Sequence, residues 1–248
     1  MIYMTDLHSH ILPHVDDGAY DTAEMKKMID LAYNDGIRKI CFTPHFKLSE
    51  FSDEADIEKY NSHTEKMFDL AKAHASSLYP DMELYLGSEI MCHSDISESI
   101  YSSYCRHIAN TSYVLIEFLP RASFFDIKNT LLKLTRKGLC PILAHAERYI
   151  ELVKSPEHVV ELKEFGCLVQ LNALSISNIK FGKVAKFIKH LLKHSLVDIV
   201  ATDAHDSKHR TPILSSAYEK ISKKYGEKTA TKLFADIPNA ILNNEKVF

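Results

Sequence analysis

The segment TDLHSHILPHVDDGA, residues 5–19, brings three histidines and two adjacent aspartates together within ten residues. His8 and His10 lie two positions apart, so on an extended strand both side chains project from the same face. Imidazole and carboxylate groups in this pattern are ligands for divalent metals, but a polar loop contains the same residue types. The remainder of the chain has to decide between a metal site and a loop.

Histidine and carboxylate side chains recur where apolar, strand-like runs end. Six of seven candidate strands are followed by such residues: His8, His10 and Asp17, then His45, Glu89, Glu117, His145, and lastly Asp203 with His205. A single histidine at a strand end is more often hydrogen-bonded or exposed than a metal ligand. In a (β/α) barrel, however, the C-terminal strand ends meet on one face and carry the chemistry. The joint placement therefore favours a metal site.

The carboxylates in this set indicate which cations would fit. Glu89 and Glu117 end otherwise apolar strands, where a lone buried charge is costly and a cation would hold the carboxylate ionised. The set contains imidazoles and carboxylates but no thiolate. This chemistry suits a polynuclear site for manganese, iron or zinc rather than a cysteine-bound structural zinc.

Other polar residues near this set are expected to have supporting or unrelated roles. Asp6 is expected to support the first-strand histidines through hydrogen bonding. Asp16 is expected to be a loop residue that hydrogen-bonds the backbone. The remaining histidines have no comparable placement and are expected to be solvated or to cap helices: His14, His63, His74, His93, His107, His158, His190, His194 and His209.

Short apolar runs alternate with helical patterns along the chain. Strands are predicted over residues 2–7, 38–43, 82–87, 112–118, 140–145, 167–172 and 197–202. Helical spacing of apolar residues predicts helices over residues 23–33, 57–78, 125–134, 159–165 and 184–192. Gly36, Gly138 and Gly166 each stand between a helical segment and the next strand, where a left-handed helix end suits glycine.

This alternation predicts parallel β-α units and right-handed crossovers, and therefore an α/β fold of the (β/α) barrel type. A chain of 248 residues is an ordinary length for one such barrel. No proline-rich or serine-rich linker divides it, so we expect a single domain over residues 1–248. The interval from Phe46 to Pro80 is expected to contain a longer, charged helix outside the barrel.

Composition narrows the function classes. A formal charge of −3, from 30 basic and 33 acidic residues, offers no polycationic surface for a nucleic acid partner. No basic-then-apolar leader and no long apolar stretch is present, so we expect a cytoplasmic protein without membrane insertion. The five cysteines have no C-x-x-C spacing and are expected to be reduced, mostly buried thiols.

The motifs DLHSHILPHVDDGA, TPHF, GSEI, LIEF, PILAHAERY and ATDAH resemble, in order and spacing, the polymerase-and-histidinol-phosphatase (PHP) superfamily. Within it, the chain is most similar to the bacterial capsule-associated, manganese-dependent protein tyrosine phosphatases. The resemblance runs nearly end to end and includes the final segment YGEKTATKLFADIPNAILNNEKV. It implies a distorted (β/α)7 barrel and a phosphomonoester hydrolase that acts on phosphotyrosine.

The resemblance also implies roles for individual residues. Three divalent ions are implied, manganese first and iron or zinc as alternatives. The implied ligands are His8, His10, Glu89 and Asp203 for one ion, Glu89, Glu117 and His145 for a second, and Asp17, His45 and His205 for the third. Arg148 and Arg210 fall where the family places phosphate-binding arginines. The implied partner is a phosphotyrosine-containing protein, namely a tyrosine autokinase that controls capsular or exopolysaccharide synthesis.

A mechanism follows as a hypothesis. A hydroxide held between two metals would attack phosphorus in line with the tyrosyl oxygen, while Arg148 and Arg210 hold the equatorial oxygens. His205 or its neighbours would supply a proton, and the phenolate is already a good leaving group. A cysteine nucleophile is not expected, because none of the five cysteines is followed six residues later by arginine.

Two positions depart from the family pattern. Many relatives have a second histidine where TPHF has Phe46, and a proline where HAER has Ala146. Phe46 is expected to alter the substrate rim beside the third metal, and Ala146 to have a mild effect. Two other functions remain open: a PHP-type phosphatase of a small metabolite such as histidinol phosphate, and a metal-binding scaffold without activity. A nuclease is disfavoured by the acidic balance.

Overall fold

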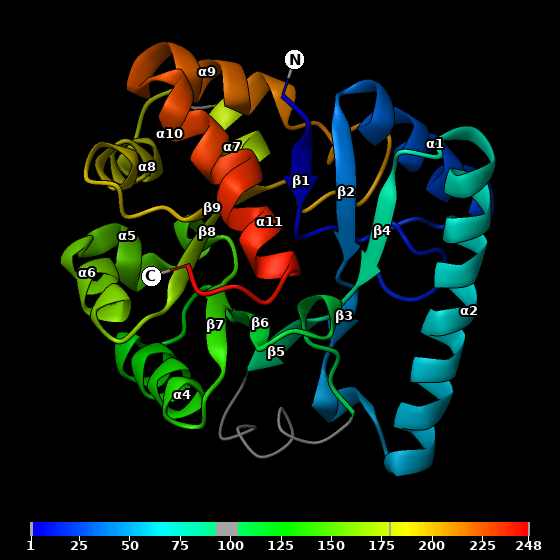
Figure 1. Ribbon diagram of the computed structural model, residues 1–248. Helices are drawn as coiled ribbons and strands as arrows, with labels where there is room; N and C mark the ends of the chain where they lie inside the picture. The colour runs from blue at the N-terminus through cyan, green and yellow to red at the C-terminus, as the bar shows by residue number, and fades with distance from the viewer. Residues whose placement is uncertain (1, 93–103, 179, 248) are drawn as a thin grey trace.

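Parallel strands form a curled sheet at the centre of the computed structural model, which describes residues 2–92, 104–178 and 180–247 (Figure 1). The strands are β1 (Met4–Asp6), β2 (Ile37–Phe42), β3 (His45–Phe46), β4 (Glu83–Leu86), β5 (Glu89–Cys92), β6 (Tyr113–Phe118), β7 (Cys140–Leu143), β8 (Leu168–Asn172) and β9 (Ile199–Ala201). Each of the seven predicted strands is therefore present. The two-residue and four-residue segments β3 and β5 were not predicted.

The strands pair in two sheets, in the orders β1-β2-β4 and β3-β5-β6-β7-β8-β9, and every pairing is parallel. Only residues 43–44 separate β2 from β3, and only residues 87–88 separate β4 from β5. Beyond β1, an isolated parallel bridge joins Ser9 to Ala204, which follows β9. The predicted α/β class is confirmed, as a curled, half-barrel parallel sheet.

Helices cover the outside of this sheet. They are α1 (Thr22–Asn34), α2 (Glu54–Leu78), α4 (Phe124–Arg136), α5 (Ile150–Lys154), α6 (Glu157–Glu164), α7 (Ala173–Ser177), α8 (Lys183–Lys193), α9 (Ser215–Tyr225), α10 (Glu227–Thr231) and α11 (Ile237–Leu242). Short 3-10 turns lie at Leu48–Glu50, Ile108–Asn110 and Ala146–Arg148, and a π-helical turn at Lys232–Asp236. In Figure 1, α1 and α2 flank one side, while α4, α5, α6 and α8 flank the other.

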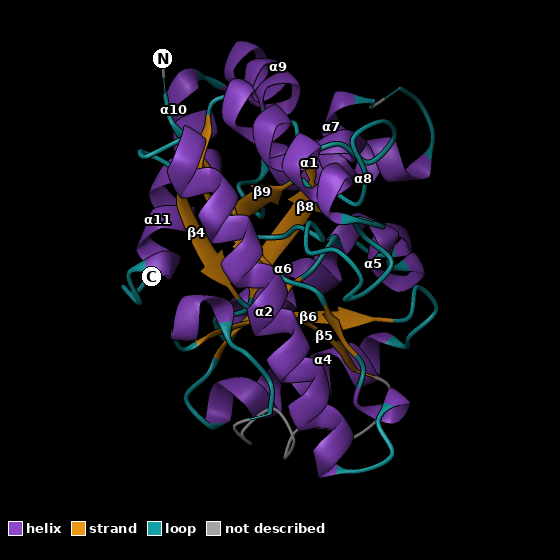
Figure 2. Cartoon of the chain, turned by 90° about the vertical axis from the view of Figure 1, so that its right-hand side faces the viewer, coloured by secondary structure: helices purple, strands orange, loops and turns teal. Residues whose placement is uncertain are grey.

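The five predicted helices all occur, and their ends have identifiable causes. The side chains of Asp21, Asp53 and Ser123 accept hydrogen bonds from the first turns of α1, α2 and α4. Gly36, Gly138 and Gly166 have φ of 93°, 87° and 88°, as the prediction for the helix ends requires. Helix α2 lies outside the strands as expected, and Figure 2 shows it running along the length of the molecule.

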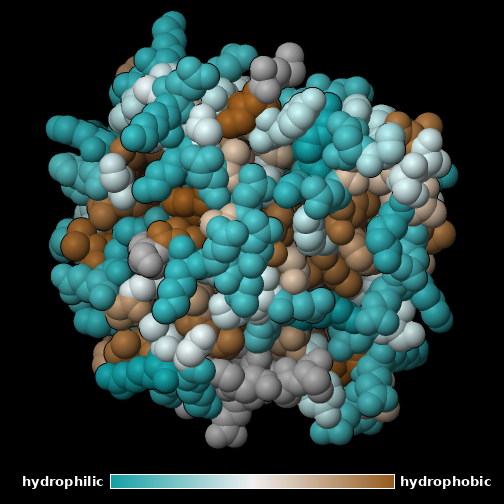
Figure 3. Space-filling view, viewed as in Figure 1, coloured by the Kyte–Doolittle hydropathy of each residue, from teal (hydrophilic) through white to brown (hydrophobic). Residues whose placement is uncertain are grey.

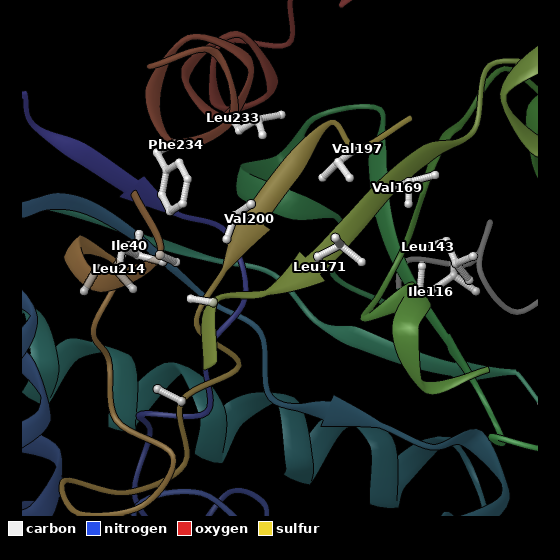
Figure 4. Packing of buried hydrophobic residues seen from close by; sticks show 14 of the residues in the cluster. Ile40, Ile116, Leu143, Val169, Leu171, Val197, Val200, Leu214, Leu233 and Phe234 are labelled. Atoms are coloured by element: carbon white, nitrogen blue, oxygen red, sulfur yellow. The ribbon is translucent and has the colours of Figure 1, made fainter. Parts of the chain in front are cut away.

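Apolar residues from strands and helices fill the space between them (Figure 4). The strands contribute Ile40, Ile116 and Leu171, and the C-terminal helical region contributes Phe234, all fully buried. All five cysteines are free thiols, four of them buried, as predicted. Within the described residues, no helix is long and apolar enough to cross a membrane.

Candidate metal centre

The C-terminal ends of the strands bring the predicted ligand residues together. His8 and His10 follow β1, and Asp203 and His205 follow β9. His45 and Glu89 begin β3 and β5, Glu117 lies near the end of β6, and His145 follows β7. Hydrogen bonds from His10 N to Ala204 O (2.8 Å) and from Asp203 N to His8 O (2.8 Å) join the first and last of these segments. Parallel topology thus gathers residues that lie up to 197 positions apart.

Four side chains form a first cluster. His8 Nε2 lies 3.3 Å from Glu89 Oε2 and 3.4 Å from Asp203 Oδ1, and His10 Nε2 lies 3.2 Å and 3.5 Å from the same two oxygens. The two imidazole Nε2 atoms are 3.2 Å apart. All four side chains are buried. Two nitrogens and two carboxylate oxygens that face one another are a donor set for a divalent cation.

Glu89 extends this cluster into a second one. His145 Nε2 lies 2.9 Å from Glu89 Oε1 and 3.2 Å from Glu117 Oε1. His45 reaches the same carboxylates from the other side, because its Nδ1 lies 3.0 Å from Glu89 Oε2 and 3.6 Å from Glu117 Oε2. Glu89 therefore stands between the two clusters, as the bridging role predicted for it requires.

A third cluster lies nearer the surface. Ligand atoms of His10, Asp17, His45 and His205 all lie within 4.8 Å of one another. Asp17 Oδ1 is 3.4 Å from His45 Nε2 and 3.5 Å from His205 Nε2, and the Asp17 side chain is 67% exposed. This grouping contains the three residues predicted for the third ion and adds His10. It also gives His45 two roles, because its Nδ1 faces the second cluster.

The buried charges shift one another's protonation. Burial alone would raise the pKa of Glu89, but His8, His10 and His145 outweigh it and hold this pKa well below the ordinary value. Burial likewise opposes the charged form of His145, yet Glu117 and Glu89 raise its pKa to about 9. The Glu89 carboxylate is therefore ionised at neutral pH and requires positive charge beside it. Protons on the imidazoles or divalent cations can supply it.

Unpaired polar atoms show that the residues fit metal ions. Glu89 Oε2, Glu117 Oε2 and His45 Nδ1 are buried and have no hydrogen-bond partner among the described residues. Buried polar atoms are normally paired, so a concentration of unpaired carboxylate and imidazole atoms calls for a ligand. Oxygen and nitrogen donors without sulfur suit manganese, iron or zinc.

Two aspartates hold the histidines of the first strand. Asp16 Oδ2 accepts hydrogen bonds from His10 Nδ1 (2.6 Å) and from the backbone N–H of His45 (3.0 Å). Asp16 was predicted only as a backbone partner, and its contact with the imidazole was missed. Asp6 accepts from the backbone N–H of His8 (3.4 Å) and from Thr202 Oγ1 (2.5 Å), so it supports the chain rather than the ring. Burial raises the pKa of Asp6 to about 6.

Strand β8 supplies no predicted ligand but orients several. Gln170 Oε1 accepts from His145 N (2.7 Å) and lies 3.2 Å from His8 Nδ1, which leaves His8 Nε2 facing the first cluster. Asn172 Nδ2 donates to Asp203 Oδ2 (2.7 Å). The sequence reasoning missed both residues. Their signal was present, since two amides at alternate positions of an otherwise apolar strand point to the same face.

The two predicted arginines lie beside the first cluster. Nη2 atoms of Arg148 and Arg210 lie 2.5 Å and 2.6 Å from Asp203 Oδ2. Both side chains remain about a third exposed, at 38% and 33%. Two guanidinium groups thus face solvent next to the clustered carboxylates, an arrangement that can bind phosphate oxygens.

Comparison with known proteins identifies the family. The sequence matches the family described as "Capsular polysaccharide synthesis, CpsB/CapC" over residues 4–243. The chain belongs to the CpsB/CapC family. This CpsB/CapC chain is 34% identical to the tyrosine-protein phosphatase CpsB of Streptococcus pneumoniae, covering 98% of this chain and all of the relative. It is 30% identical to the tyrosine-protein phosphatase YwqE of Bacillus subtilis, covering 99% and 94%.

A solved structure leads to the same conclusion for the CpsB/CapC fold. The chain superposes with a TM-score of 0.86 at 27% identity, over 99% of this chain and 96% of the other. That structure comes from work on YwqE of Bacillus subtilis and CpsB of Streptococcus pneumoniae, described as unique metal-dependent tyrosine phosphatases. The resemblance drawn from the motifs is confirmed at the level of family and fold.

Backbone geometry at this CpsB/CapC site is constrained. His145 and Asp203 have φ of 32° and 53°, in the left-handed region that non-glycine residues seldom adopt. Such conformations persist where surrounding contacts fix them, commonly at functional sites. A Cβ on Gly18 would lie 1.9 Å from the carbonyl oxygen of His10, so this position in the DDGA motif accepts only glycine without a shift of the loop.

The expected effect of Phe46 on the rim was wrong. Phe46 is 1% exposed and packs against Phe51 and Tyr60, with ring centroids 5.3 Å and 6.0 Å away. Its aromatic ring belongs to the core because the alternation along β3 turns His45 toward the site and Phe46 away from it. Ala146 is fully buried.

Other histidines of this CpsB/CapC chain lie apart from the centre. His74 contacts Asp30 at 2.9 Å, and His158 stacks on Phe124. His93 lies outside the described residues.

A cavity of about 320 Å³ lies beside Asp17 and His45. Its other lining residues are Val15, Asp16, Lys47, Glu50, Phe51 and Tyr60.

Proposed function

We propose that this CpsB/CapC protein is a metal-dependent protein tyrosine phosphatase, a hydrolase of phosphotyrosine. The observation that carries the proposal is the convergence of four imidazoles on the buried carboxylate of Glu89, with Arg148 and Arg210 beside the same cluster. The imidazoles and carboxylates of this arrangement can bind cations, and the two guanidinium groups can bind a phosphate group beside them. The curated relatives, which align over nearly the whole chain, are named tyrosine-protein phosphatases, and this supports phosphotyrosine as the substrate class.

We propose three divalent ions, with manganese preferred and iron or zinc as alternatives. The proposed ligands are His8, His10, Glu89 and Asp203 for the first ion, Glu89, Glu117 and His145 for the second, and Asp17, His45 and His205 for the third. The clusters described above support these sets. When bound, divalent ions would neutralise phosphoryl charge and lower the pKa of a water ligand toward about 7, which supplies the nucleophile.

The chain's own residues bind the phosphoryl group and handle the leaving oxygen. Arg148 and Arg210 bind the equatorial phosphoryl oxygens with the N–H groups that point to solvent, while Asp203 holds both guanidinium groups in place. His205 hydrogen-bonds through Nδ1 to the carbonyl oxygen of Asp203 at 3.0 Å, which leaves Nε2 toward the rim. Because this Nε2 is the atom that would bind the third ion beside Asp17, a neighbouring group supplies the proton for the tyrosyl oxygen. The proton donor need not be a strong acid, because the phenol that leaves has a pKa near 10.

The proposed substrate is a phosphotyrosine-containing protein, namely a bacterial tyrosine kinase that controls capsular or exopolysaccharide synthesis. The description of the family as one of capsular polysaccharide synthesis supports this partner. The cavity beside Asp17 and His45 offers room for the aromatic ring, next to the apolar side chains of Val15 and Phe51. We place the protein in the cytoplasm, where such a kinase tail is phosphorylated.

We further propose that residues 1–248 form one PHP-type domain with a distorted (β/α)7 barrel. Counting β2 with β3 and β4 with β5 as interrupted strands gives seven strands. The bridge between Ser9 and Ala204 supports closure between the first and the last of them.

A small-molecule phosphatase is the main alternative, because the same metals would hydrolyse a metabolite such as histidinol phosphate. The deciding experiment compares kcat/KM of manganese-reconstituted protein on a phosphotyrosine peptide and on histidinol phosphate. We expect the peptide to be preferred. A preference for histidinol phosphate by orders of magnitude would overturn the substrate proposal. Full metal occupancy with no hydrolysis of either compound would instead support a metal-binding scaffold.

A further inference from the structure

Positive charge is concentrated in one stretch of this chain. Between Glu164 and Asp198 the sequence contains no carboxylate and five lysines: Lys180, Lys183, Lys186, Lys189 and Lys193. The chain as a whole carries a formal charge of −3, so this stretch departs sharply from the average. Four of the five lysines lie on α8 (Lys183–Lys193), and the fifth lies in the loop before it.

All five lysines, which we call the lysine face, are exposed. Helix α8 buries its opposite side, where Ala185, Phe187, Ile188 and Leu191 pack into the core. Among the described residues, no carboxylate forms an ion pair with any lysine of the face. In Figure 1, α8 lies at the edge of the molecule, and Figure 3 shows a largely hydrophilic surface there.

A groove between α5 and α8 adds to this positive surface. It has a volume of about 420 Å³, and its described lining residues are Val153, Lys154, Pro156, Lys183, Lys186, Phe187 and His190. None of these is acidic, and only Lys154 has a nearby carboxylate, Glu151 at 3.1 Å. Three lysines around an apolar floor form a concave site for a phosphate ester rather than for a cation.

An exposed aromatic ring stands at the end of the lysine face. Phe181 is 97% exposed, and the neighbouring Val184 is 44% exposed. Lys180 and Lys183 flank Phe181 in the sequence, and Val184 follows Lys183. Figure 2 shows the loop between α7 and α8 extending away from the body of the molecule. Because α7 directly follows β8, the chain runs to this loop through α7 from the end of the sheet where the candidate metal ligands lie.

We propose that the lysine face docks this protein on an anionic phospholipid bilayer. Headgroup phosphates would contact the five lysines and enter the groove, and Phe181 would lie among the headgroups. A single-sign surface with one protruding aromatic residue matches a membrane interface, where lysines attract anionic lipids and aromatic rings are favoured. An acidic protein segment would match the charge but gives Phe181 no environment. Docking is peripheral, since no described helix can span a bilayer.

The test measures flotation of manganese-loaded protein of residues 1–248 with vesicles of phosphatidylcholine alone or with about 30% phosphatidylglycerol, at low and high salt. The test variant replaces Lys180, Lys183, Lys186 and Lys189 by glutamine. The control replaces four exposed lysines of α1 and α2, on the other side of the molecule, by glutamine: Lys26, Lys59, Lys66 and Lys72. Circular dichroism checks that both variants remain folded, so the test does not depend on the proposed phosphatase activity.

We expect the native protein and the control variant to bind only anionic vesicles, and salt to weaken this binding. Each lysine near an anionic membrane contributes about fivefold to the binding constant, so the loss of four lysines should weaken binding more than a hundredfold. Phe181→Ser should weaken vesicle binding more than Phe125→Ser does. Phe125 is a matched control, because its ring is also exposed, at 72%. Equal binding by test and control variants would overturn the proposal.

Two additional measurements distinguish the anionic bilayer from other anionic ligands. Displacement from vesicles by millimolar inorganic phosphate would indicate a site for a soluble anion, and would overturn docking on a surface. Failure to bind anionic vesicles, together with lysine-dependent binding of a polyglutamate peptide, would assign the face to an acidic protein and overturn the lipid proposal. Both outcomes leave the proposed phosphatase activity untouched, so the two proposals fail independently.

Discussion

Glu89 is the residue on which the centre depends most. Four imidazoles, those of His8, His10, His45 and His145, lie 3.3, 3.2, 3.0 and 2.9 Å from its oxygens. Glu89→Gln keeps the shape but removes the charge that two proposed ions share. We expect kcat/KM on a phosphotyrosine peptide to fall by at least about a thousandfold. Metal analysis should show fewer ions bound per chain.

Glu83→Gln is the matched control for that change, because Glu83 lies on β4, is exposed and pairs with Lys39 at 3.4 Å. It should retain full activity and metal content. Undiminished activity of Glu89→Gln would refute the proposed polynuclear centre.

Asp16 tests whether orientation of an imidazole matters separately from metal binding. Its carboxylate fixes His10 through the 2.6 Å contact with Nδ1. In Asp16→Asn we expect the manganese concentration needed for half-maximal activity to rise about 10- to 100-fold. Activity should largely return at saturating manganese. Asp69→Asn, at an exposed position paired with Lys72, serves as the control and should leave the manganese requirement unchanged.

The cysteines give a third prediction at this scale. Burial raises the pKa of Cys41, Cys105 and Cys167 to about 12 each, so these thiols are protonated and unreactive at neutral pH. Iodoacetamide at pH 7.5 should therefore leave phosphatase activity intact, while unfolding in urea should make the thiols rapidly reactive. Peptide hydrolysis measures the activity, and mass spectrometry measures the labelling of each thiol before and after unfolding. Inactivation in step with labelling of one cysteine would point to a thiol nucleophile and contradict the mechanism.

At the scale of elements, β8 orients the ligand side chains although it supplies no proposed metal ligand itself. Gln170→Leu would leave the backbone N–H of His145 and the ring of His8 without their buried partner. We expect a loss of about 1–3 kcal/mol in the free energy of unfolding, because an unsatisfied buried polar group carries that cost. Urea unfolding of the metal-free protein measures it.

The elements also show which features were predictable. Periodicity located the seven principal strands and five helices, because each one buries a face with its own spacing. It did not locate β3 and β5, since residues 45–46 and 89–92 are short and begin with polar site residues. The helices after residue 214 were also missed. The assignment of Phe46 to the rim failed because neighbouring residues on a strand face opposite sides.

The predicted ligands were recognisable because histidine and carboxylate are unusual at apolar strand ends. The supporting contacts were not recognisable in the same way. Gln170 and Asn172 stood out as two amides on one strand face, but their partners did not. Gln170 contacts His145 and His8, which lie 25 and 162 positions away, and Asn172 contacts Asp203, 31 positions away. Such pairs appear only once the strands are placed in space. The left-handed backbone of His145 and Asp203 likewise carries no mark in residue type.

At the scale of the whole molecule, metal ions should join parts of the fold that are distant in sequence. Ligands that bind only the folded state stabilise it, by about 4 kcal/mol at a thousandfold excess over Kd. For a chain of this size that corresponds to roughly 10 °C in Tm. Calorimetry of chelator-treated and manganese-loaded protein should show this difference. An identical Tm would exclude tight binding at the proposed centre.

The bridge between Ser9 and Ala204 has a consequence for how the protein is made. The ribosome delivers His8 long before His205, roughly 10 to 40 s earlier at ordinary rates of synthesis. Glu89, Glu117 and His145 emerge within that interval, but Asp203 and His205, which complete the first and third clusters, come last. We therefore expect the proposed metal sites to be complete only late in synthesis, once residues 203 to 205 have emerged.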